Sequence, residues 1–275
     1  MPEALAAPSI AEALREASST LAAAGCDTPR LDAELLLAGA LGVERARLVL
    51  DAGATLNPAP RERFRSFLAR REAREPVAYI LGRKDFRRIT LHVDRRVLIP
   101  RPETELLVEI GLTLPFGASV ADVGTGSGAV ALALADERPD LSVWATDIDP
   151  DALTVARENG SRLGLEVEFV QADLLDGPGL PRRVDAVLAN LPYVAEQSDL
   201  PPEIGGYEPP LALFGGPDGM DPVRRLLPMD ADVPLVALEV GLPEAVASHM
   251  IRSGFRSVER LRDLAGHERV VLARR

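Results

Sequence analysis

Residues 119–273 alternate between short apolar segments and longer segments with helical periodicity. The pattern predicts helices at 103–112, 129–137 and 150–163, and strands at 119–123, 141–147, 167–171, 184–189, 233–239, 255–260 and 269–273. Because strand–helix–strand units close with right-handed crossovers, we predict an α/β fold whose seven-stranded sheet is doubly wound and mostly parallel. Ligands bind such sheets beyond the carboxyl ends of the strands, so the residues that follow each strand are the first candidates for a site.

The N-terminal part of the chain has a different pattern. Helices are expected at 9–25, opened by a Ser9–Glu12 capping box, at 28–42, and between Asn57 and Pro76. Residues 77–100 then contain β-like stretches around Phe86, at 89–93 and at 97–99. We therefore predict three parts: a small all-helical domain (1–76), a linker with a β-hairpin (77–100), and the α/β domain (101–275).

The third expected helix carries six arginines among glutamates: Arg61, Arg63, Arg65, Arg70, Arg71 and Arg74. Two interpretations stay open. The arginines form either a solvated helix face with internal ion pairs, which we favour, or a surface that contacts a partner.

Composition narrows the class of protein. The 275 residues are 47% hydrophobic and 27% charged, a globular mixture, and the longest apolar run, 35–43, is too short to span a membrane. Glu3 stands where a signal peptide carries positive charge, so we expect a soluble, cytoplasmic protein. Cys26 is the single cysteine, which excludes an internal disulfide and a zinc site. The net charge of −11 argues against binding to duplex DNA.

A glycine-rich loop follows the first strand of the α/β domain and opens a helix; it reads Gly124-Thr125-Gly126-Ser127-Gly128. Glycines allow a sharp turn and the close approach of a ligand, and a helix N-terminus offers free N–H donors. With Ala129 the loop also satisfies the dinucleotide-binding fingerprint. The loop predicts a nucleotide-like ligand and leaves its identity open.

Acidic residues end the next two strands. Asp149 precedes Pro150 and is expected to cap a helix, whereas Asp147 is free of such a duty and can accept both hydroxyl groups of a ribose. Asp173 and Leu174 follow the third strand, where an adenine ring and its amino group could lie. For Asp173, a turn or cap residue is an equal alternative.

The fourth strand ends in Asn190-Leu191-Pro192-Tyr193. A polar Asn at the end of a buried apolar strand needs a partner, so we expect Asn190 to face the site. Pro192 holds Leu191 in an extended conformation, which lets the Asn190 side-chain oxygen and the Leu191 carbonyl converge on one NH₂ group. Tyr193 can stack on the planar group that carries this nitrogen.

This tetrapeptide resembles the Asn-Pro-Pro-Tyr motif of S-adenosylmethionine-dependent methyltransferases that act on planar amino or amide nitrogens. Further segments, at 76–82, 97–105, 207–209 and 211–216, together with the glycine loop, resemble the HemK/PrmC-type protein-glutamine methyltransferases. The resemblance covers nearly the whole chain. It implies a Rossmann-like methyltransferase fold and an enzyme that methylates the glutamine of the Gly-Gly-Gln motif in peptide chain release factors.

The resemblance also implies roles for residues. S-adenosyl-L-methionine, which becomes S-adenosyl-L-homocysteine, would be held by Gly124 to Gly128, Asp147, Asp173, Leu174 and Asn190. The substrate glutamine would be held by the catalytic Asn190, Leu191, Pro192 and Tyr193. Arg101, Thr104 and Glu105 match a family segment near the cofactor without an assigned role, and a helix start with its cap and ion pairs is an equal alternative for them. The expected protein is a monomer with release factors as partners, with no metal, no direct DNA binding and no membrane association.

Other functions stay open, in this order of preference: a ribosomal-protein glutamine methyltransferase, then a nucleic-acid adenine or guanine amino methyltransferase, then an NAD-dependent oxidoreductase or a non-catalytic nucleotide-binding module.

The sequence departs from the family pattern in three places. Leu191 replaces the first proline of the motif, so we expect weaker preorganisation. The hairpin segment 86–88 lacks the usual glycine, and segment 226–234 lacks the usual Lys-Pro-Gly-Gly turn.

Overall fold

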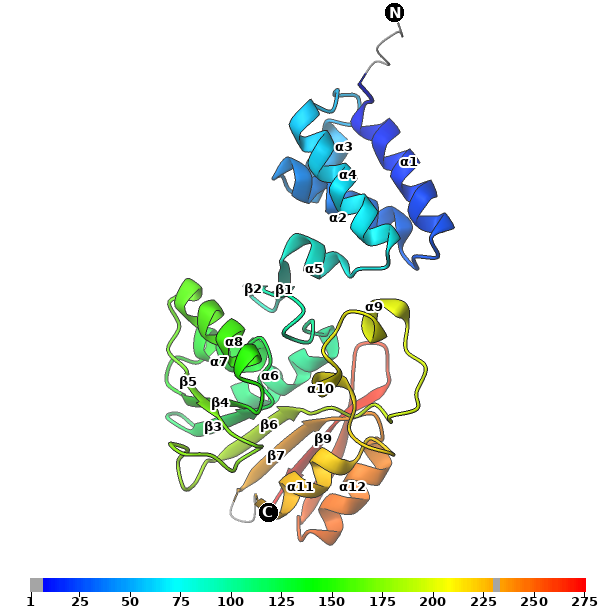
Figure 1. Cartoon of the computed structure of the whole chain (residues 1–275). Coiled ribbons are helices and arrows are strands. Elements are labelled where there is room, and N and C mark those ends of the chain that lie inside the picture. Colours follow the sequence, from blue (N-terminus) through cyan, green and yellow to red (C-terminus); the bar gives the residue numbers. More distant parts are fainter. Residues whose placement is uncertain (1–6, 230–232) are drawn as a thin grey trace, which may run out of the picture. The chain divides into compact units, whose positions relative to one another are not determined.

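A computed structural model describes residues 7–229 and 233–275 (Figure 1). Within this part, the chain forms two compact units. One contains the residues up to Gly82 together with Leu200–Tyr207, and the other contains Arg83–Asp199 and Glu208–Arg275. Glu3, and residues 230–232 of the segment that lacks the family turn, lie outside the described residues.

The first unit is helical. Its elements are α1 (Ile10–Ala23), α2 (Pro29–Leu41), α3 (Arg45–Leu50), α4 (Pro58–Glu72), α5 (Val77–Leu81) and α9 (Pro202–Gly205). The Ser9–Glu12 capping box is present, and the three expected helices are confirmed as α1, α2 and α4. The sequence grouped residues 77–81 with the hairpin, but they form α5, because Gly82 takes a left-handed conformation that closes a short helix over buried Tyr79 and Ile80.

The arginines at the end of α4 form ion pairs inside this unit. Arg71 is buried and donates to Asp32 of α2 at 2.8 Å and to Glu203 of α9 at 2.9 Å. Arg74 donates to both oxygens of Glu203, at 2.6 and 2.7 Å. The expected solvated face with internal ion pairs is therefore wrong for these two arginines, since Arg71 is buried and both pair with residues of distant segments. The pairs Arg65–Glu62 and Arg70–Glu75 fit that expectation. The ion pairs with Glu203 explain why residues 200–207, which follow the fourth strand of the α/β unit in sequence, belong to the helical unit.

The second unit is built on a seven-stranded sheet, as expected. Its strand order is β5-β4-β3-β6-β7-β9-β8, in which β3 to β7 are parallel and β9 runs antiparallel to both β7 and β8. The strands are β3 (Ser119–Val123), β4 (Ser142–Asp147), β5 (Glu168–Gln171), β6 (Ala186–Asn190), β7 (Leu235–Glu239), β8 (Ser257–Arg262) and β9 (Glu268–Arg274). The predicted doubly wound, mostly parallel sheet is therefore confirmed.

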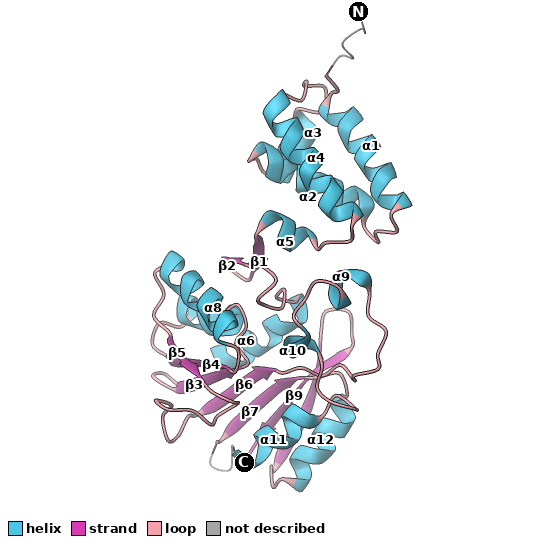
Figure 2. Ribbon diagram, viewed as in Figure 1, coloured by secondary structure: helices cyan, strands magenta, loops and turns pink. Residues whose placement is uncertain are grey.

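Helices cover both faces of this sheet. Figure 2 shows α6 (Glu105–Leu112), α7 (Ala129–Glu137) and α8 (Pro150–Leu163) over one face, and α11 (Asp221–Met229) and α12 (Pro243–Arg252) over the other. The short elements η1 (Pro102–Thr104) and α10 (Pro210–Leu213) lie in the loops. Strands β6 and β7 are continuous apolar runs up to their last residues because they are buried on both faces. The valines, alanines and leucines of β3, β6 and β7 form the core.

A two-stranded hairpin precedes the sheet, formed by β1 (Arg83–Phe86) and β2 (Ile89–His92). The predicted hairpin is confirmed, whereas the third β-like stretch, 97–99, is not a strand. At the turn, Arg87 has φ +50°, a conformation that glycine adopts without strain. Its side chain ion-pairs with Glu109 and Glu137. These two contacts hold the turn residue against α6 and α7.

No helix among the described residues is long and apolar enough to cross a membrane.

Candidate functional site

The site lies where the direction of the chain through the sheet reverses. From β3 the chain continues to β4 and β5 on one side, and from β6 it continues to β7 on the other. At such a switch point the loops after adjacent parallel strands diverge and leave a crevice. A cavity of about 290 Å³ occupies this position, and residues after β3, β4, β5 and β6 line it together with 96–98 and parts of 209–225.

The glycine loop at the end of β3 is anchored by the buried Asp122. Its Oδ2 accepts hydrogen bonds from the Thr125 hydroxyl at 2.6 Å and from the Ala131 N–H, in the first turn of α7, at 3.1 Å. Burial raises the pKa of Asp122 to about 6. Gly124 has φ +74°, and a Cβ there would lie 3.3 Å from Leu191 Cδ2. The positive φ therefore favours glycine at this position, and the side chain of Leu191 packs closely against it.

Asp147 lies at the carboxyl end of β4 and lines the cavity. Its Oδ2 accepts the Gly126 N–H at 2.9 Å and its Oδ1 accepts the Asp149 N–H at 3.0 Å. Burial raises the pKa of the carboxyl group, while these backbone N–H groups oppose the rise. The Ile148 N–H also lowers this pKa, and a carboxylate with its several acceptor positions can still accept from a ligand beside these backbone donors. Asp149 caps α8 as expected, since its Oδ1 accepts the Asp151 N–H at 2.8 Å.

Asp173 and Leu174 follow β5 and also line the cavity. The Asp173 carboxylate forms an ion pair with Arg225 of α11, which itself reaches the cavity. Leu174 has φ +58°, an uncommon conformation for a branched residue, and its carbonyl accepts the Thr146 hydroxyl at 2.9 Å. Asp173 thus lies at a turn and also forms an ion pair with Arg225.

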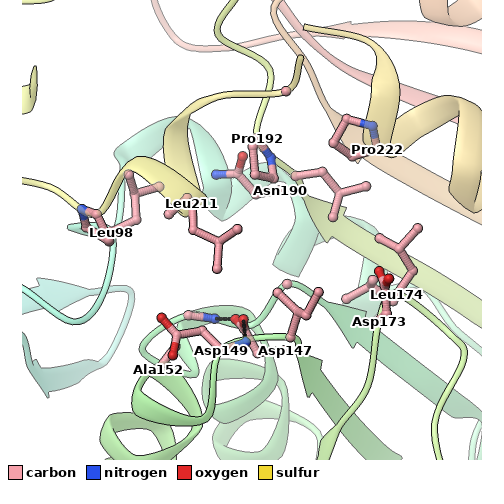
Figure 3. A pocket seen from close by; sticks show the side chains of 18 of the residues that line it. Leu98, Asp147, Asp149, Ala152, Asp173, Leu174, Asn190, Pro192, Leu211 and Pro222 are labelled. Atoms are coloured by element: carbon pink, nitrogen blue, oxygen red, sulfur yellow. Dashed lines mark hydrogen bonds between the residues drawn. The ribbon is translucent and has the colours of Figure 1, made fainter. Parts of the chain in front are cut away.

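Asn190 ends β6 and faces the cavity, on the side opposite Asp147 (Figure 3). Its Nδ2 donates to Thr104 Oγ1 at 3.1 Å, and the Thr104 hydroxyl donates to Glu239 Oε2 at 2.6 Å. Glu239 ends β7, the next strand, where only 2% of its surface is exposed. Burial raises the pKa of Glu239 to about 7.

Tyr193 is half-buried and does not line the cavity itself. The Tyr193 backbone packs closely against Gly219. This glycine has φ +76°, and a Cβ there would lie 2.1 Å from the Tyr193 carbonyl oxygen. The ring packs on Gly241, where a Cβ would lie 2.9 Å from Cδ2. Burial raises the pKa of the Tyr193 hydroxyl, and the charge of Glu239 adds to this rise.

The segment that follows the tetrapeptide is tied to it by backbone hydrogen bonds. The Val194 N–H donates to the Leu213 carbonyl at 2.9 Å, and the Gly215 N–H donates to the Val194 carbonyl at 2.9 Å. Glu208, which is buried, accepts from the Ile99 N–H at 3.2 Å and from Arg101 Nη2 at 2.5 Å. These contacts hold the cavity-lining residues Val97 and Leu98 and the cavity-lining part of segment 209–216 in place.

The structure gathers most of the predicted site residues around one cavity. Its lining includes Gly124, Gly126, Asp147, Asp173, Leu174, Asn190, Leu191 and Pro192. Thr125, Ser127, Gly128 and Tyr193 lie beside the cavity without lining it. Ser127 and Gly128 have structural roles instead. The Ser127 carbonyl accepts a hydrogen bond from Nδ2 of the buried Asn159 at 3.0 Å, and Gly128, with φ +84°, is the N-cap residue of α7.

Sequence reasoning gave no role to Thr104 and did not consider Glu239. The signal for Glu239 was present, because it is a polar residue that ends a buried apolar strand, as Asn190 is. Among the described residues, no group of three or more metal-ligating side chains is placed to hold an ion.

Comparisons with known proteins agree with this architecture. Residues 12–82 match the family described as "PrmC N-terminal domain", and residues 120–202 match the "Methyltransferase domain" family. Among solved structures, a methyltransferase from Pyrococcus furiosus matches with a TM-score of 0.50 and 21% identity, covering 67% of this chain and 87% of that one. The hMettl16 catalytic domain, in complex with MAT2A 3′UTR hairpin 1, matches with a TM-score of 0.56 and 18% identity, covering 76% and 80%. At these identities the structural likeness shows the fold alone.

Curated sequences give closer relatives. A protein of Moorella thermoacetica named "Release factor glutamine methyltransferase" is 42% identical, covering 96% of this chain and 98% of its own length. Proteins with the same name from Cereibacter sphaeroides and Caulobacter vibrioides are 42% and 38% identical over 96% of this chain.

Proposed function

This chain belongs to the family of release factor glutamine methyltransferases, and on that basis we propose that it transfers a methyl group from S-adenosyl-L-methionine to a glutamine side-chain amide nitrogen of peptide chain release factors. The glutamine is that of the Gly-Gly-Gln motif. The observation that carries the proposal is the position of Asn190: it faces a cavity whose opposite wall is formed by the glycine loop and Asp147. A methyl donor and a planar nitrogen can therefore meet between these two walls.

The residues around the cavity fit S-adenosyl-L-methionine. Asp147 keeps acceptor positions that suit the two hydroxyl groups of a ribose. Gly126 has open space where a Cβ would stand, so its backbone can approach the ligand closely. Leu174 supplies an apolar surface for an adenine ring. When bound, this cofactor supplies an electrophilic methyl group on a positively charged sulfur.

The chain contributes orientation of the acceptor nitrogen. Amide nitrogens are poor nucleophiles because their lone pair is delocalised into the carbonyl group. The Asn190 side-chain oxygen and the Leu191 carbonyl would accept one N–H bond each, which fixes the direction of the lone pair and stabilises positive charge that develops on nitrogen. Leu191 is buried and packs against Gly124, so packing holds its backbone where the family uses proline.

Tyr193 has a supporting role in this proposal. Its raised pKa keeps the hydroxyl protonated at neutral pH. A neutral ring can stack on the glutamine amide plane, and the hydroxyl remains a hydrogen-bond donor. After transfer, the methylated nitrogen is far more acidic and loses its proton to water, so the chain needs no dedicated base before the transfer.

The helical unit is proposed to recognise the release factor, within the boundaries 1–76 given by the sequence. Arg63 and Arg65 of α4 are exposed, and Arg65 lies 3.7 Å from Glu62 in a surface ion pair, whereas Arg71 and Arg74 are held by Glu203. Reversing both charges, by Arg63→Glu with Arg65→Glu, is expected to raise KM for an intact release factor. KM for a short Gly-Gly-Gln peptide should stay unchanged. An equal change for both acceptors would argue against this role. We further propose that the protein acts as a cytoplasmic monomer without binding DNA.

The function is tested by incubating the protein with labelled S-adenosyl-L-methionine and one of three acceptors: a purified release factor, a ribosomal protein, or DNA. Label in the release factor alone is the expected result. Label in the ribosomal protein or in DNA instead would favour one of the other methyltransferase functions. Asn190→Ala is the matched variant: we expect methyl transfer to fall by about 100-fold or more, since the acceptor nitrogen loses one of its two partners, while cofactor binding weakens much less.

A further inference from the structure

We propose that Thr104 and Glu239 are positioning residues that fix the orientation of the Asn190 amide, so that its oxygen and not its nitrogen faces the acceptor nitrogen. This inference rests on the proposed function, in which the Asn190 oxygen accepts an N–H bond of the substrate. It assigns a role to two residues that do not line the cavity.

The three side chains form one line of hydrogen bonds. Asn190 Nδ2 donates to Thr104 Oγ1 at 3.1 Å, and the Thr104 hydroxyl donates to Glu239 Oε2 at 2.6 Å. Thr104 and Glu239 are 5% and 2% exposed, so water does not compete for these bonds. The residues come from η1, the end of β6 and the end of β7, and β6 and β7 pair directly through Asn190 and Glu239. The line is thus built into rigid parts of the fold.

The direction of donation along this line of hydrogen bonds follows from the charge of Glu239. An ionised carboxylate can only accept hydrogen bonds, so the Thr104 hydroxyl must donate its hydrogen to Glu239. The lone pairs of Thr104 Oγ1 then require a donor, which only the NH₂ side of the Asn190 amide supplies. The opposite amide orientation would set two acceptors against each other, at a cost similar to that of an unpaired buried polar group. The carboxylate thereby directs the Asn190 oxygen away from Thr104 and toward the cavity.

Protonation of Glu239 removes the preference for this orientation of the Asn190 amide. A neutral carboxyl can donate to Thr104, which frees the threonine proton for the Asn190 oxygen and lets the amide turn its NH₂ group to the cavity. An NH₂ group there would repel the N–H bonds of the acceptor. The charged groups that act on Glu239 are Glu103, which favours the protonated form, and Arg101 and Arg269, which favour the ionised form. The Tyr193 hydroxyl also senses the charge of Glu239.

The line also bears on the departure at residue 191. A proline there would restrict the backbone next to Asn190, and leucine does not. Thr104 restrains the side chain of Asn190 directly, and this restraint does not depend on residue 191. Preorganisation of the acceptor site is therefore divided between backbone packing at Leu191 and the side-chain line through Thr104.

The test compares full-length Thr104→Val, Thr104→Ser and Glu239→Gln proteins with the wild type, using release factor and S-adenosyl-L-methionine. Valine keeps the shape of threonine but removes the hydroxyl, and serine keeps the hydroxyl. We expect Thr104→Val to lower kcat by about tenfold or more, which is the effect of one lost hydrogen bond. Its affinity for S-adenosyl-L-homocysteine should stay within about twofold of wild type, since Thr104 does not line the cavity. Thr104→Ser should retain most of the wild-type kcat.

The pH profile separates positioning from a merely structural role. Wild-type kcat/KM should rise with pH through the pKa of Glu239, about 7, because the ionised form directs the amide. Glu239→Gln should lose this rise, because a glutamine amide does not change its charge. This measurement also covers the case in which Thr104→Val fails to fold.

The outcomes distinguish the two proposals. Asn190→Ala without activity, together with Thr104→Val at near-wild-type kcat, would overturn the positioning role and leave the proposed function standing. The same holds if Glu239→Gln keeps the wild-type pH profile. An active Asn190→Ala, or no transfer to release factor by the wild type, would overturn both proposals.

Discussion

Replacing Asp147 by Asn gives the sharpest test of the cofactor half of the site. The carboxylate accepts the Gly126 and Asp149 N–H groups at 2.9 and 3.0 Å, and the Ile148 N–H also lowers its pKa. The acceptor capacity that remains is proposed to bind the hydroxyl groups of a ribose. In asparagine the oxygen keeps one backbone donor and one hydroxyl group, while the NH₂ group faces a backbone N–H and cannot accept the second hydroxyl. The variant loses one charge-assisted hydrogen bond and weakens another, a loss of about 2–3 kcal/mol, or roughly 30- to 150-fold in affinity.

The assay is isothermal titration calorimetry with S-adenosyl-L-homocysteine. Asp149→Asn is the matched control, because Asp149 lines the same cavity and carries the same charge, and asparagine is an equally good helix cap. We expect affinity to fall for Asp147→Asn and to change by less than about threefold for the control. Equal losses in the two variants would mean that the charge of the cavity, and not a specific contact of Asp147, governs binding, which would refute the reasoning.

Three further predictions concern the support of the site and of the helical unit. Gly219→Ala should lower the free energy of unfolding by about 2 kcal/mol or more and reduce methyl transfer. Residue 219 has positive φ, and a Cβ there would collide with the Tyr193 carbonyl oxygen. Unchanged thermal unfolding and activity would contradict this close approach of Gly219 to Tyr193. Glu203→Gln should destabilise the helical unit by about 1–3 kcal/mol at pH 7, measured by chemical denaturation, because it weakens the ion pairs with Arg71 and Arg74. These arginines lower the pKa of Glu203 to about 2, so the difference from wild type should be present above its unfolded pKa and vanish as the pH falls toward 2.

The doubly wound, mostly parallel sheet and the edge that carries the site could be predicted from the sequence because both depend on local patterns. Buried parallel strands appear as apolar runs, and the residues that follow them must meet at one edge of the sheet. Asp147, Asn190 and the glycine loop were found in this way, and all reach one cavity. The cap at Asp149 was predicted for the same reason, since an N-cap depends only on its neighbours in sequence.

The contacts that were missed join residues far apart in sequence. The helical periodicity of α4 cannot show that Arg71 and Arg74 meet Glu203, which lies about 130 residues later. In the same way, nothing in segment 102–105 indicates that Thr104 stands between Asn190 and Glu239. Residues 77–81 were grouped with the hairpin because apolar residues over five positions fit a strand as well as one helical turn, and only the Gly82 cap separates the two.

The most direct test of the central claim is to locate the methyl group. A release factor is incubated with the protein and S-adenosyl-L-methionine, digested, and analysed by fragmentation mass spectrometry. The account predicts one added methyl group on the side-chain amide of the Gly-Gly-Gln glutamine, absent when Asn190→Ala replaces the wild type. A methyl group on another residue, or a release factor that remains unmodified although S-adenosyl-L-homocysteine binds the protein, would contradict it.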